Sequence, residues 1–280
     1  MSAMLVELAI GDAYGAGFEY APQEFVVRYN TLESYVQRPT HLGIAPGAYT
    51  DDTQMTLAIA ELMVDGTPWT PLALADKFVE VYHRDRRDGY AGGFQRFLES
   101  VSSGAEFLRR IRPDSDKSGA AMRAGPIGLL PAVAEVRRHA ALQARVTHDT
   151  PAGVAAAEAA ALAVHYCHFE LGPLADIGRW VDDELGGGWS RPWRGKVGSK
   201  GEMSVRAALT ALADATSLSG LLRRCVAFTG DVDTVATVAL AAASRSPQIE
   251  HDLAGPLYDQ LENGEYGHVY LRQLDSSLLR

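Results

Sequence analysis

The sequence has little of what marks secreted and membrane-spanning proteins. Its two cysteines, Cys167 and Cys225, lie far apart in apolar surroundings, so neither a disulfide framework nor a thiolate metal site is predicted. The first residues include no basic segment, and Glu7 and Asp12 interrupt the apolar run there, so no secretory signal is expected. No stretch is long and apolar enough to span a membrane. We therefore expect an unsecreted, cytoplasmic protein without a membrane partner.

The chain also has fewer basic than acidic residues. The 280 residues include 26 Lys and Arg against 35 Asp and Glu, which gives a formal net charge of −9. Phosphate-binding surfaces need a basic excess, so a broad nucleic-acid-binding face is not expected, although a local basic patch is compatible with this balance. A hydrophobic content of 47% with 22% charged residues is ordinary for a globular protein, and a chain of this length buries a substantial core.

Signals for β-structure are scarce as well. No Asn-Gly or Asp-Gly turn joins two alternating segments, and nearly every long periodic segment has helical spacing. Without an internal repeat or a low-complexity linker, the sequence predicts a single all-α domain over residues 1–280. Residues 24–36 are mixed in character, and the chain is predicted to end in a tail without a helix. The expected helices are 4–15, 53–63, 70–84, 127–139, 150–168, 203–213, 218–227, 235–244 and 253–261.

A long irregular loop is predicted over residues 181–204. Loops of this length inside a compact domain are usually functional or mobile. Its tryptophans, Trp189 and Trp193, and its basic residues would suit a substrate that carries a nucleotide. Surface mobility explains the same composition nearly as well, so both interpretations stay open.

The most informative stretch is Thr50-Asp51-Asp52-Thr53, directly before a predicted helix. A single Thr or Asp in this place is what an ordinary helix N-cap requires, and a cap is the simplest interpretation of the stretch taken alone. Two carboxylates and two hydroxyls in four residues exceed that requirement. A similar group, Asp231, Asp233 and Thr234, begins a later helix of small and β-branched residues.

If the two helix starts meet in the fold, their oxygens form a site for hard divalent cations. Mg²⁺ and Mn²⁺ take oxygen ligands, whereas Zn²⁺ is less suited because no cysteine or paired histidine joins the set. Four carboxylates would overload one small cation, so two cations about 3.5 to 4 Å apart are expected. Without metal, the like charges should repel one another and destabilise the site.

Other candidate sites are weaker. Ser118, His148 and Asp149 resemble a nucleophile with a base, but no strand-to-helix nucleophile turn accompanies them. His148 taken alone is more readily a structural residue near a helix start. The segment 11–15 lacks the glycines and the lysine of a phosphate loop. The small residues of 117–126 serve tight helix packing as readily as they serve a ligand.

Six short motifs occur in order along most of the chain. They are Gly11–Glu19 (GDxxGxxxE), Thr50–Met55 (TDDTxM), Gly89–Gly93 (similar to RGYGxG), Gly119–Arg123 (GAAMR), Thr147-His148 (TH) and Gly230–Thr234 (GDxDT). One match alone would be weak, but this order is specific, and the set resembles the ADP-ribosylglycohydrolase family. Three positions depart from the family pattern. Thr229-Gly230 replaces a double glycine, Ser118-Gly119 replaces a GNG, and Asp88 replaces the Arg of the RGYG turn.

The resemblance implies an orthogonally packed bundle of helices, with two Mg²⁺ or Mn²⁺ ions at the bottom of a cleft for ADP-ribose. Carried over by position, the metal ligands would be Thr50, Asp51, Asp52, Asp231, Asp233 and Thr234. Glu19, Asp52 and Asp233 would be the catalytic carboxylates, with Glu19 beside the metals as acid or base. Asp12 would fix the first helix or support the ligands. The ADP-ribose pocket would be lined by Tyr90, Ser118, Gly119 and His148.

The implied activity is hydrolysis of the N- or O-glycosidic bond of an ADP-ribosyl group. The substrate is expected to be an ADP-ribosylated protein side chain, and the enzyme is expected to be a monomer. Two alternatives stay open. One is an ADP-ribose-binding or structural protein without turnover, and the other is the same hydrolysis on a small-molecule or nucleic-acid conjugate. The motifs do not distinguish arginine, serine and other linkages.

Overall fold

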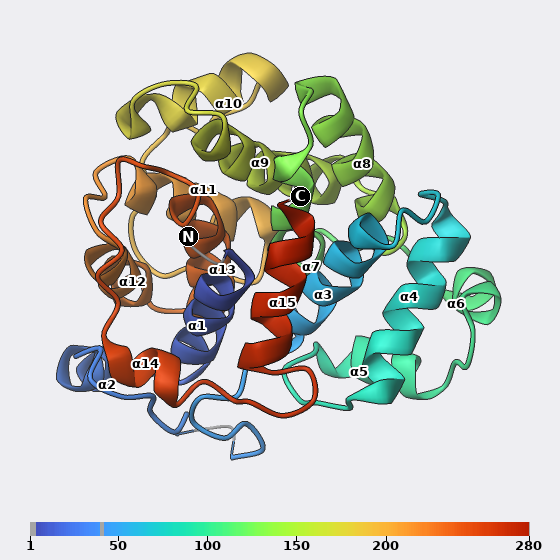
Figure 1. The fold of residues 1–280 in the computed structure, drawn as a ribbon, viewed down its shortest axis with the longest axis horizontal. Helices are drawn as coiled ribbons and strands as arrows, with labels where there is room; N and C mark the ends of the chain where they lie inside the picture. The colour runs from blue at the N-terminus through green and yellow to red at the C-terminus, as the bar shows by residue number, and fades with distance from the viewer. Residues whose placement is uncertain (1–3, 40–41, 280) are drawn as a thin grey trace.

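The computed structural model describes residues 4–39 and 42–279 of the chain. Its regular elements are helices, and the β-bridges within these ranges are isolated pairs such as Val197 with Gly230. The predicted all-α bundle is therefore confirmed (Figure 1). The elements are α1 (Met4–Ala16), α2 (Gln23–Tyr29), α3 (Asp51–Val64), α4 (Pro71–Arg84), α5 (Gly92–Glu99), α6 (Gly104–Arg110), α7 (Gly119–Met122), the 3₁₀ helix η1 (Gly125–Leu129), α8 (Val133–Arg145), α9 (Pro151–His168), the 3₁₀ helix η2 (Leu174–Asp176), α10 (Ile177–Leu185), α11 (Gly201–Leu212), α12 (Leu218–Ala227), α13 (Val232–Ala243), α14 (Gly255–Asp259) and α15 (His268–Leu278).

The centre of the molecule is formed by α1 and α13, whose residues are all buried. Both helices are apolar around most of their circumference, as expected for helices that are enclosed by others. They lie against each other, and α3, α9, α11, α12 and α15 pack around them (Figure 1). Within the described residues, no helix combines the length and the apolar character that crossing a lipid bilayer requires.

Threonine side chains cap the start of three helices, and the cap at Thr50 is the one that the sequence predicts. Thr50 accepts a hydrogen bond from the backbone N–H of Asp52, Thr70 from that of Ala73, and Thr150 from that of Gly153. Prolines follow directly in α4 and α9, where a missing N–H costs nothing. The cap interpretation of the acidic stretch at the start of α3 is therefore confirmed.

The start of α3 is also tied to α1 through the buried carboxylate of Asp12. Thr50 donates to this carboxylate from its backbone N at 2.9 Å and from its hydroxyl at 2.7 Å. Thr53 does the same at 2.9 and 2.6 Å. Four donors on one carboxylate fix the first turn of α3 against the middle of α1. Asp12 thus supports the segment that carries Asp51 and Asp52.

Two glycines let α1 and α13 approach along their backbones. A Cβ atom built on Gly15 would lie 2.5 Å from the Cα of Asp233, and one on Gly11 would lie 2.9 Å from the carbonyl oxygen of Ala236. Both distances are too short for real side chains, so only glycine permits this crossing. The first turn of α13, with Asp233, is thereby held directly against α1.

The C-terminal segment differs from the prediction, because α15 forms where a tail without a helix is expected. Its Leu271 and Leu274 are buried, and the helix packs on α1 and α3. The carboxylate of Asp275 accepts the backbone N–H of Leu5 at 2.9 and 3.1 Å, so α15 caps the start of α1. Leu271, Leu274 and Leu278 recur at helical spacing, so the apolar period of this helix is present in the sequence and the prediction of a tail was wrong.

The long irregular loop is also shorter than predicted. Helix α10 continues to Leu185 and α11 begins at Gly201, so the irregular part covers 186–200. The carboxylate of Asp182 accepts the backbone N–H groups of Trp189 and Ser190 at 2.6 and 3.1 Å. Trp189 is buried by this folding back of the chain, so its ring belongs to the core.

The α1–α13 crossing generates a stability prediction. Gly15→Ala adds a methyl group that meets the backbone of α13, which cannot move aside as a side chain does. We expect the free energy of unfolding, measured with a chemical denaturant, to fall by about 1–3 kcal/mol. Gly255→Ala in α14 is the control, because nothing lies within 4 Å of an added Cβ there. An equal loss of stability in both variants would contradict the packing argument.

Candidate metal centre

A cavity of about 730 Å³ lies where the starts of α3, α7 and α13 converge. This volume is typical of sites for small organic ligands. Of the predicted site residues, Thr50 and Tyr90 are buried and do not line the cavity. Those that line it are Glu19, Asp51, Asp52, Ser118, Gly119, His148, Asp231, Asp233 and Thr234.

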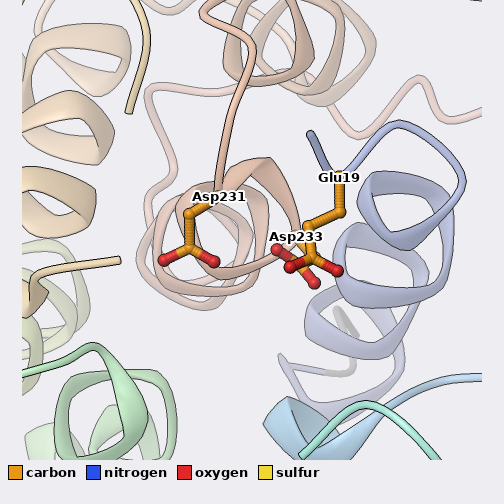
Figure 2. A group of neighbouring side chains, drawn as sticks. All are labelled: Glu19, Asp231 and Asp233. Carbon is orange, nitrogen blue, oxygen red and sulfur yellow. The ribbon is translucent and has the colours of Figure 1, made fainter. Parts of the chain in front are cut away.

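Five carboxylates face this cavity, and we call them the acidic cluster: Glu19, Asp51, Asp52, Asp231 and Asp233. Three of them, Glu19, Asp231 and Asp233, each place one oxygen so that the three oxygens lie within 4.8 Å of one another. Figure 2 shows Glu19, just beyond α1, reaching toward Asp233, with Asp231 beside them. Asp51 and Asp52 enter from the first turn of α3. The two acidic helix starts thus meet in space, as the metal hypothesis requires.

One oxygen of the acidic cluster has no protein partner. Oδ2 of Asp52 is buried and has no hydrogen bond within the described residues. Leaving a buried carboxylate oxygen without a partner is costly unless a cation or a proton compensates for it. Two of the other carboxylates have donors: Ser204 donates to Oδ2 of Asp231 at 3.0 Å, and the backbone of Thr234 donates to Oδ1 of Asp233 at 3.0 Å. Such an oxygen-only donor set fits a hard divalent cation.

Burial is the main cause that raises the pKa of every carboxyl group in the acidic cluster. For Asp51, Asp52 and Asp233 the pKa lies well above its usual range, because neighbouring carboxylates add their repulsion. The pKa of Glu19 rises to about 7, although its ion pair with Arg38 at 2.7 Å opposes the rise. Without cations, burial and mutual repulsion therefore favour the protonated form of these carboxyl groups.

Thr50 does not line the cavity, but its hydroxyl contacts the backbone of Asp52 in the acidic cluster. Its hydroxyl donates to Asp12 and receives the N–H of Asp52 at 3.4 Å, so Asp12 orients the hydroxyl. Thr234 is buried at the start of α13, where its side chain opposes the rise in the pKa of Asp52 and Asp231. That either hydroxyl binds a metal stays a prediction.

Tyr90 lies behind the cavity wall. Its hydroxyl donates to Oε1 of Gln54 at 2.6 Å, and its ring packs edge-on against Tyr82. The neighbouring Gly89 and Ala91 line the cavity instead. A Cβ on Gly89 would lie 2.8 Å from Oδ1 of Asp51, and its φ of +120° also favours glycine. The conformation of this turn is what keeps Asp51 accessible.

The alternative nucleophile set does not assemble. Asp149 forms an ion pair with Arg145 at 3.5 Å and is largely exposed. His148 instead has its Nδ1 atom 2.7 Å from the hydroxyl of Thr147. Burial, with a smaller contribution from Arg123, lowers the pKa of His148 to about 3, so its imidazole is neutral at physiological pH. It lines the cavity beside Gly119.

A second wall of the cavity was not predicted from the sequence. It combines aromatic, apolar and basic side chains, and no pairing of acidic residues marks it. The sequence indicates this wall only indirectly, because its residues lie near the glycine-rich turn at 89–93 and the small residues at 117–126. Its members include Phe94, Phe97, Arg110, Ile111, Arg112 and Lys117. The loop at 186–200 contributes Ser199, and neither Trp189 nor Trp193 faces the cavity.

The turn before α13 contains one departure from the family pattern, Thr229 in place of the first of two glycines. Gly230 has a φ of +93°, and an added Cβ there would lie 1.8 Å from the carbonyl oxygen of Val197, so glycine is required. Thr229 has a φ of +61°, a left-handed conformation that a β-branched residue adopts only with strain. A double glycine would fit this turn without that strain.

Three comparisons agree on what this chain is similar to. The ADP-ribosylhydrolase ARH3 of Xenopus tropicalis is 28% identical over 191 residues, which cover 64% of this chain and 53% of that protein. The ADP-ribosyl-[dinitrogen reductase] glycohydrolase of Rhodospirillum rubrum is 29% identical over 169 residues, which cover 57% and 54%. The chain therefore spans about half the length of these relatives.

The same fold occurs in a solved ADP-ribosylglycohydrolase-related protein complex. That structure aligns with 99% of this chain and 95% of its own, with a TM-score of 0.71 and 22% identity. A sequence model described as ADP-ribosylglycohydrolase matches residues 2–245, which is most of the chain. This protein therefore belongs to the ADP-ribosylglycohydrolase family.

Proposed function

We propose that this protein hydrolyses the glycosidic bond between an ADP-ribosyl group and its acceptor, with a protein side chain as the expected acceptor. The observation that carries the proposal is the acidic cluster at the cavity, with an unpartnered buried oxygen on Asp52. Family membership supports it, as do relatives whose names describe hydrolysis of ADP-ribosyl groups. We further propose that the enzyme acts in the cytoplasm as a monomer.

Divalent cations, two of Mg²⁺ or Mn²⁺, fit the donor set. All the donors are oxygens, and the orphaned Oδ2 of Asp52 lacks the positive charge that would make its burial favourable. When bound, such cations supply Lewis acidity toward ribose hydroxyls and water. The residues that would hold them are Thr50, Asp51, Asp52, Asp231, Asp233 and Thr234.

Glu19 is the best placed residue to move a proton. Burial raises its pKa, whereas bound cations would lower it, and general acid–base catalysis requires a pKa near the working pH. Arg38 holds one of its oxygens at 2.7 Å and thereby orients the carboxyl group. Asp52 and Asp233 face the same point and stabilise the positive charge that develops on the sugar as the bond breaks.

The second wall suits the rest of an ADP-ribosyl group. Phe94 and Phe97 offer ring faces for an adenine, and Arg112 and Lys117 offer positive charge for a diphosphate. Ser118, Gly119 and His148 line the cavity between this wall and the acidic cluster, and Tyr90 supports the glycine turn behind Asp51. The local positive charge contrasts with the net charge of −9 of the chain. This contrast favours an anionic ligand at this cavity.

Catalysis is tested by two variants with different expected defects. Asp52→Asn should weaken Mn²⁺ binding and lower the release of ADP-ribose from a modified protein by roughly a hundredfold or more. Glu19→Gln should bind Mn²⁺ as the wild type does but lower turnover by about 10²- to 10⁴-fold. Release is measured by chromatography and metal binding by calorimetry, with Asp214→Asn, an exposed position, as the control.

Panels of arginine-linked and serine-linked proteins and of small ADP-ribose conjugates separate the substrate classes in the same assay. Full activity in EDTA would contradict the metal-dependent mechanism. Binding of ADP-ribose by the wild type without release from any substrate would instead favour a non-catalytic binding protein.

The raised pKa values predict how stability depends on pH without metal. A carboxyl group whose pKa is higher in the folded state binds more protons when folded, so its stabilisation is lost as pH rises through that pKa. For Glu19 this window runs from 4.5 to about 7, and the other members of the acidic cluster act in the same direction. In EDTA, we expect Tm to fall by about 4 °C or more between pH 5 and pH 8.

Added Mn²⁺ should raise Tm most at pH 8, where the ligands are deprotonated. The double variant Asp52→Asn/Asp233→Asn should show a smaller fall in Tm over the same range, because two titrating groups are removed while Glu19 remains. Thermal denaturation followed by circular dichroism measures all three cases. A wild-type Tm that rises with pH in EDTA would contradict the assignment of raised pKa values.

A further inference from the structure

Arg123 is a buried arginine whose hydrogen bonds go to neutral groups. It follows α7 and is only 1% exposed. Its Nε donates to Oε1 of Gln143 at 2.6 Å, and one terminal nitrogen donates to the carbonyl oxygen of Gln143 at 3.1 Å and to the hydroxyl of Thr147 at 2.8 Å. The guanidinium lies 4.3 Å from the centre of the Phe78 ring. Its position is thus fixed from several sides.

Thr147 links this arginine to a histidine of the cavity. Its hydroxyl oxygen lies 2.8 Å from the Arg123 nitrogen and 2.7 Å from Nδ1 of His148. A guanidinium only donates, so Thr147 accepts from Arg123. The single hydroxyl proton then has one acceptor among the hydrogen bonds of the described residues, and that acceptor is Nδ1 of His148.

This chain of donors determines the tautomer of His148. If Nδ1 carried a proton, it would point at a hydroxyl oxygen that already accepts from a cation, and the Thr147 proton would lose its acceptor. If Nδ1 is unprotonated, Thr147 accepts from Arg123 and donates to His148, so both hydrogen bonds of its hydroxyl are formed. The proton of the neutral imidazole is therefore on Nε2.

The edge of the ring that carries Cε1 and Nε2 lies next to Gly119. A Cβ on Gly119 would lie 3.1 Å from Cε1 and 3.3 Å from Nε2 of His148, so the glycine leaves this edge of the ring open. Both residues line the cavity. We propose that Arg123 and Thr147 are positioning residues that fix His148 with its proton on Nε2, so that it donates a hydrogen bond to an oxygen of the bound ADP-ribosyl group. The identity of that ligand rests on the proposed function.

The charges around His148 favour its neutral imidazole, in which one ring nitrogen donates a hydrogen bond and the other accepts one. Arg123 and Lys117 both disfavour the imidazolium form. Asp116 favours it, but its carboxylate is paired with Lys200 at 2.7 Å. His148 therefore keeps one protonation state through the neutral pH range and differs in this from Glu19.

The tautomer is read directly from protein labelled with ¹⁵N-histidine. Long-range ¹H–¹⁵N correlation spectra distinguish Nε2–H from Nδ1–H, and His148→Gln identifies the resonance. We expect Nε2–H in the wild type from pH 6 to pH 8, with and without ADP-ribose. An Nδ1–H tautomer or an imidazolium in this range would overturn the proposal, and this result needs no variant of Thr147 to fold.

The role of Thr147 is tested by matched substitutions. Thr147→Val removes the hydroxyl, and we expect signals of both tautomers and about tenfold weaker ADP-ribose binding by calorimetry in Mg²⁺. Thr147→Ser restores the wild-type spectrum and affinity. Thr237→Val is the control, because the buried Thr237 hydroxyl has no hydrogen bond within the described residues, and its spectrum and affinity should not change.

An unchanged tautomer in Thr147→Val would overturn the role of Thr147. If the wild type bound no ADP-ribose, the proposed function would fail, and the spectra would still decide the tautomer on their own.

Discussion

The buried carboxylate of Asp12 is the interaction on which the arrangement of the site depends. It accepts four hydrogen bonds from Thr50 and Thr53 and so joins the first turn of α3 to the middle of α1. The same helix carries Gly15, whose missing side chain lets α13 approach. Helix α1 therefore sets the distance between the two acidic helix starts, although it contributes no carboxylate that lines the cavity within its own length.

This arrangement brings five carboxyl groups together at the wall of one cavity. Burial raises the pKa of each carboxyl group, and the groups raise one another further. The positive charge of Arg38, which forms an ion pair with Glu19, partly offsets the negative charge of that carboxylate. A protein that keeps such a cluster without more positive charge gives up stability for function, a common balance at active sites. The pattern supports a cation-binding role better than a structural one.

The parts of the fold that follow from local sequence could be predicted, and those that depend on distant contacts could not. The Thr N-caps of α3, α4 and α9 and the acidic helix starts are visible within a few residues. The capping of α1 by Asp275 joins residues 270 apart in the sequence, which no local pattern indicates. The bend that buries Trp189 depends on Asp182, seven residues earlier, although neither side chain forms a recognised turn motif. Tyr90 shows the same limit within a motif, because its contact with Gln54 decides that the glycine beside it faces the cavity. The link from Arg123 to His148 likewise needs the packing of α7 against α8.

The contact between Asp275 and the start of α1 has a consequence for how the protein is made. The two partners are 270 residues apart, so α1 lacks its cap until residue 275 has left the ribosome. Its other main neighbour, α13, is also synthesised late. Contacts of such long sequence separation form slowly. The carboxylates that Asp12 and Gly15 help to bring together thus reach their final arrangement only after residue 275 has been synthesised.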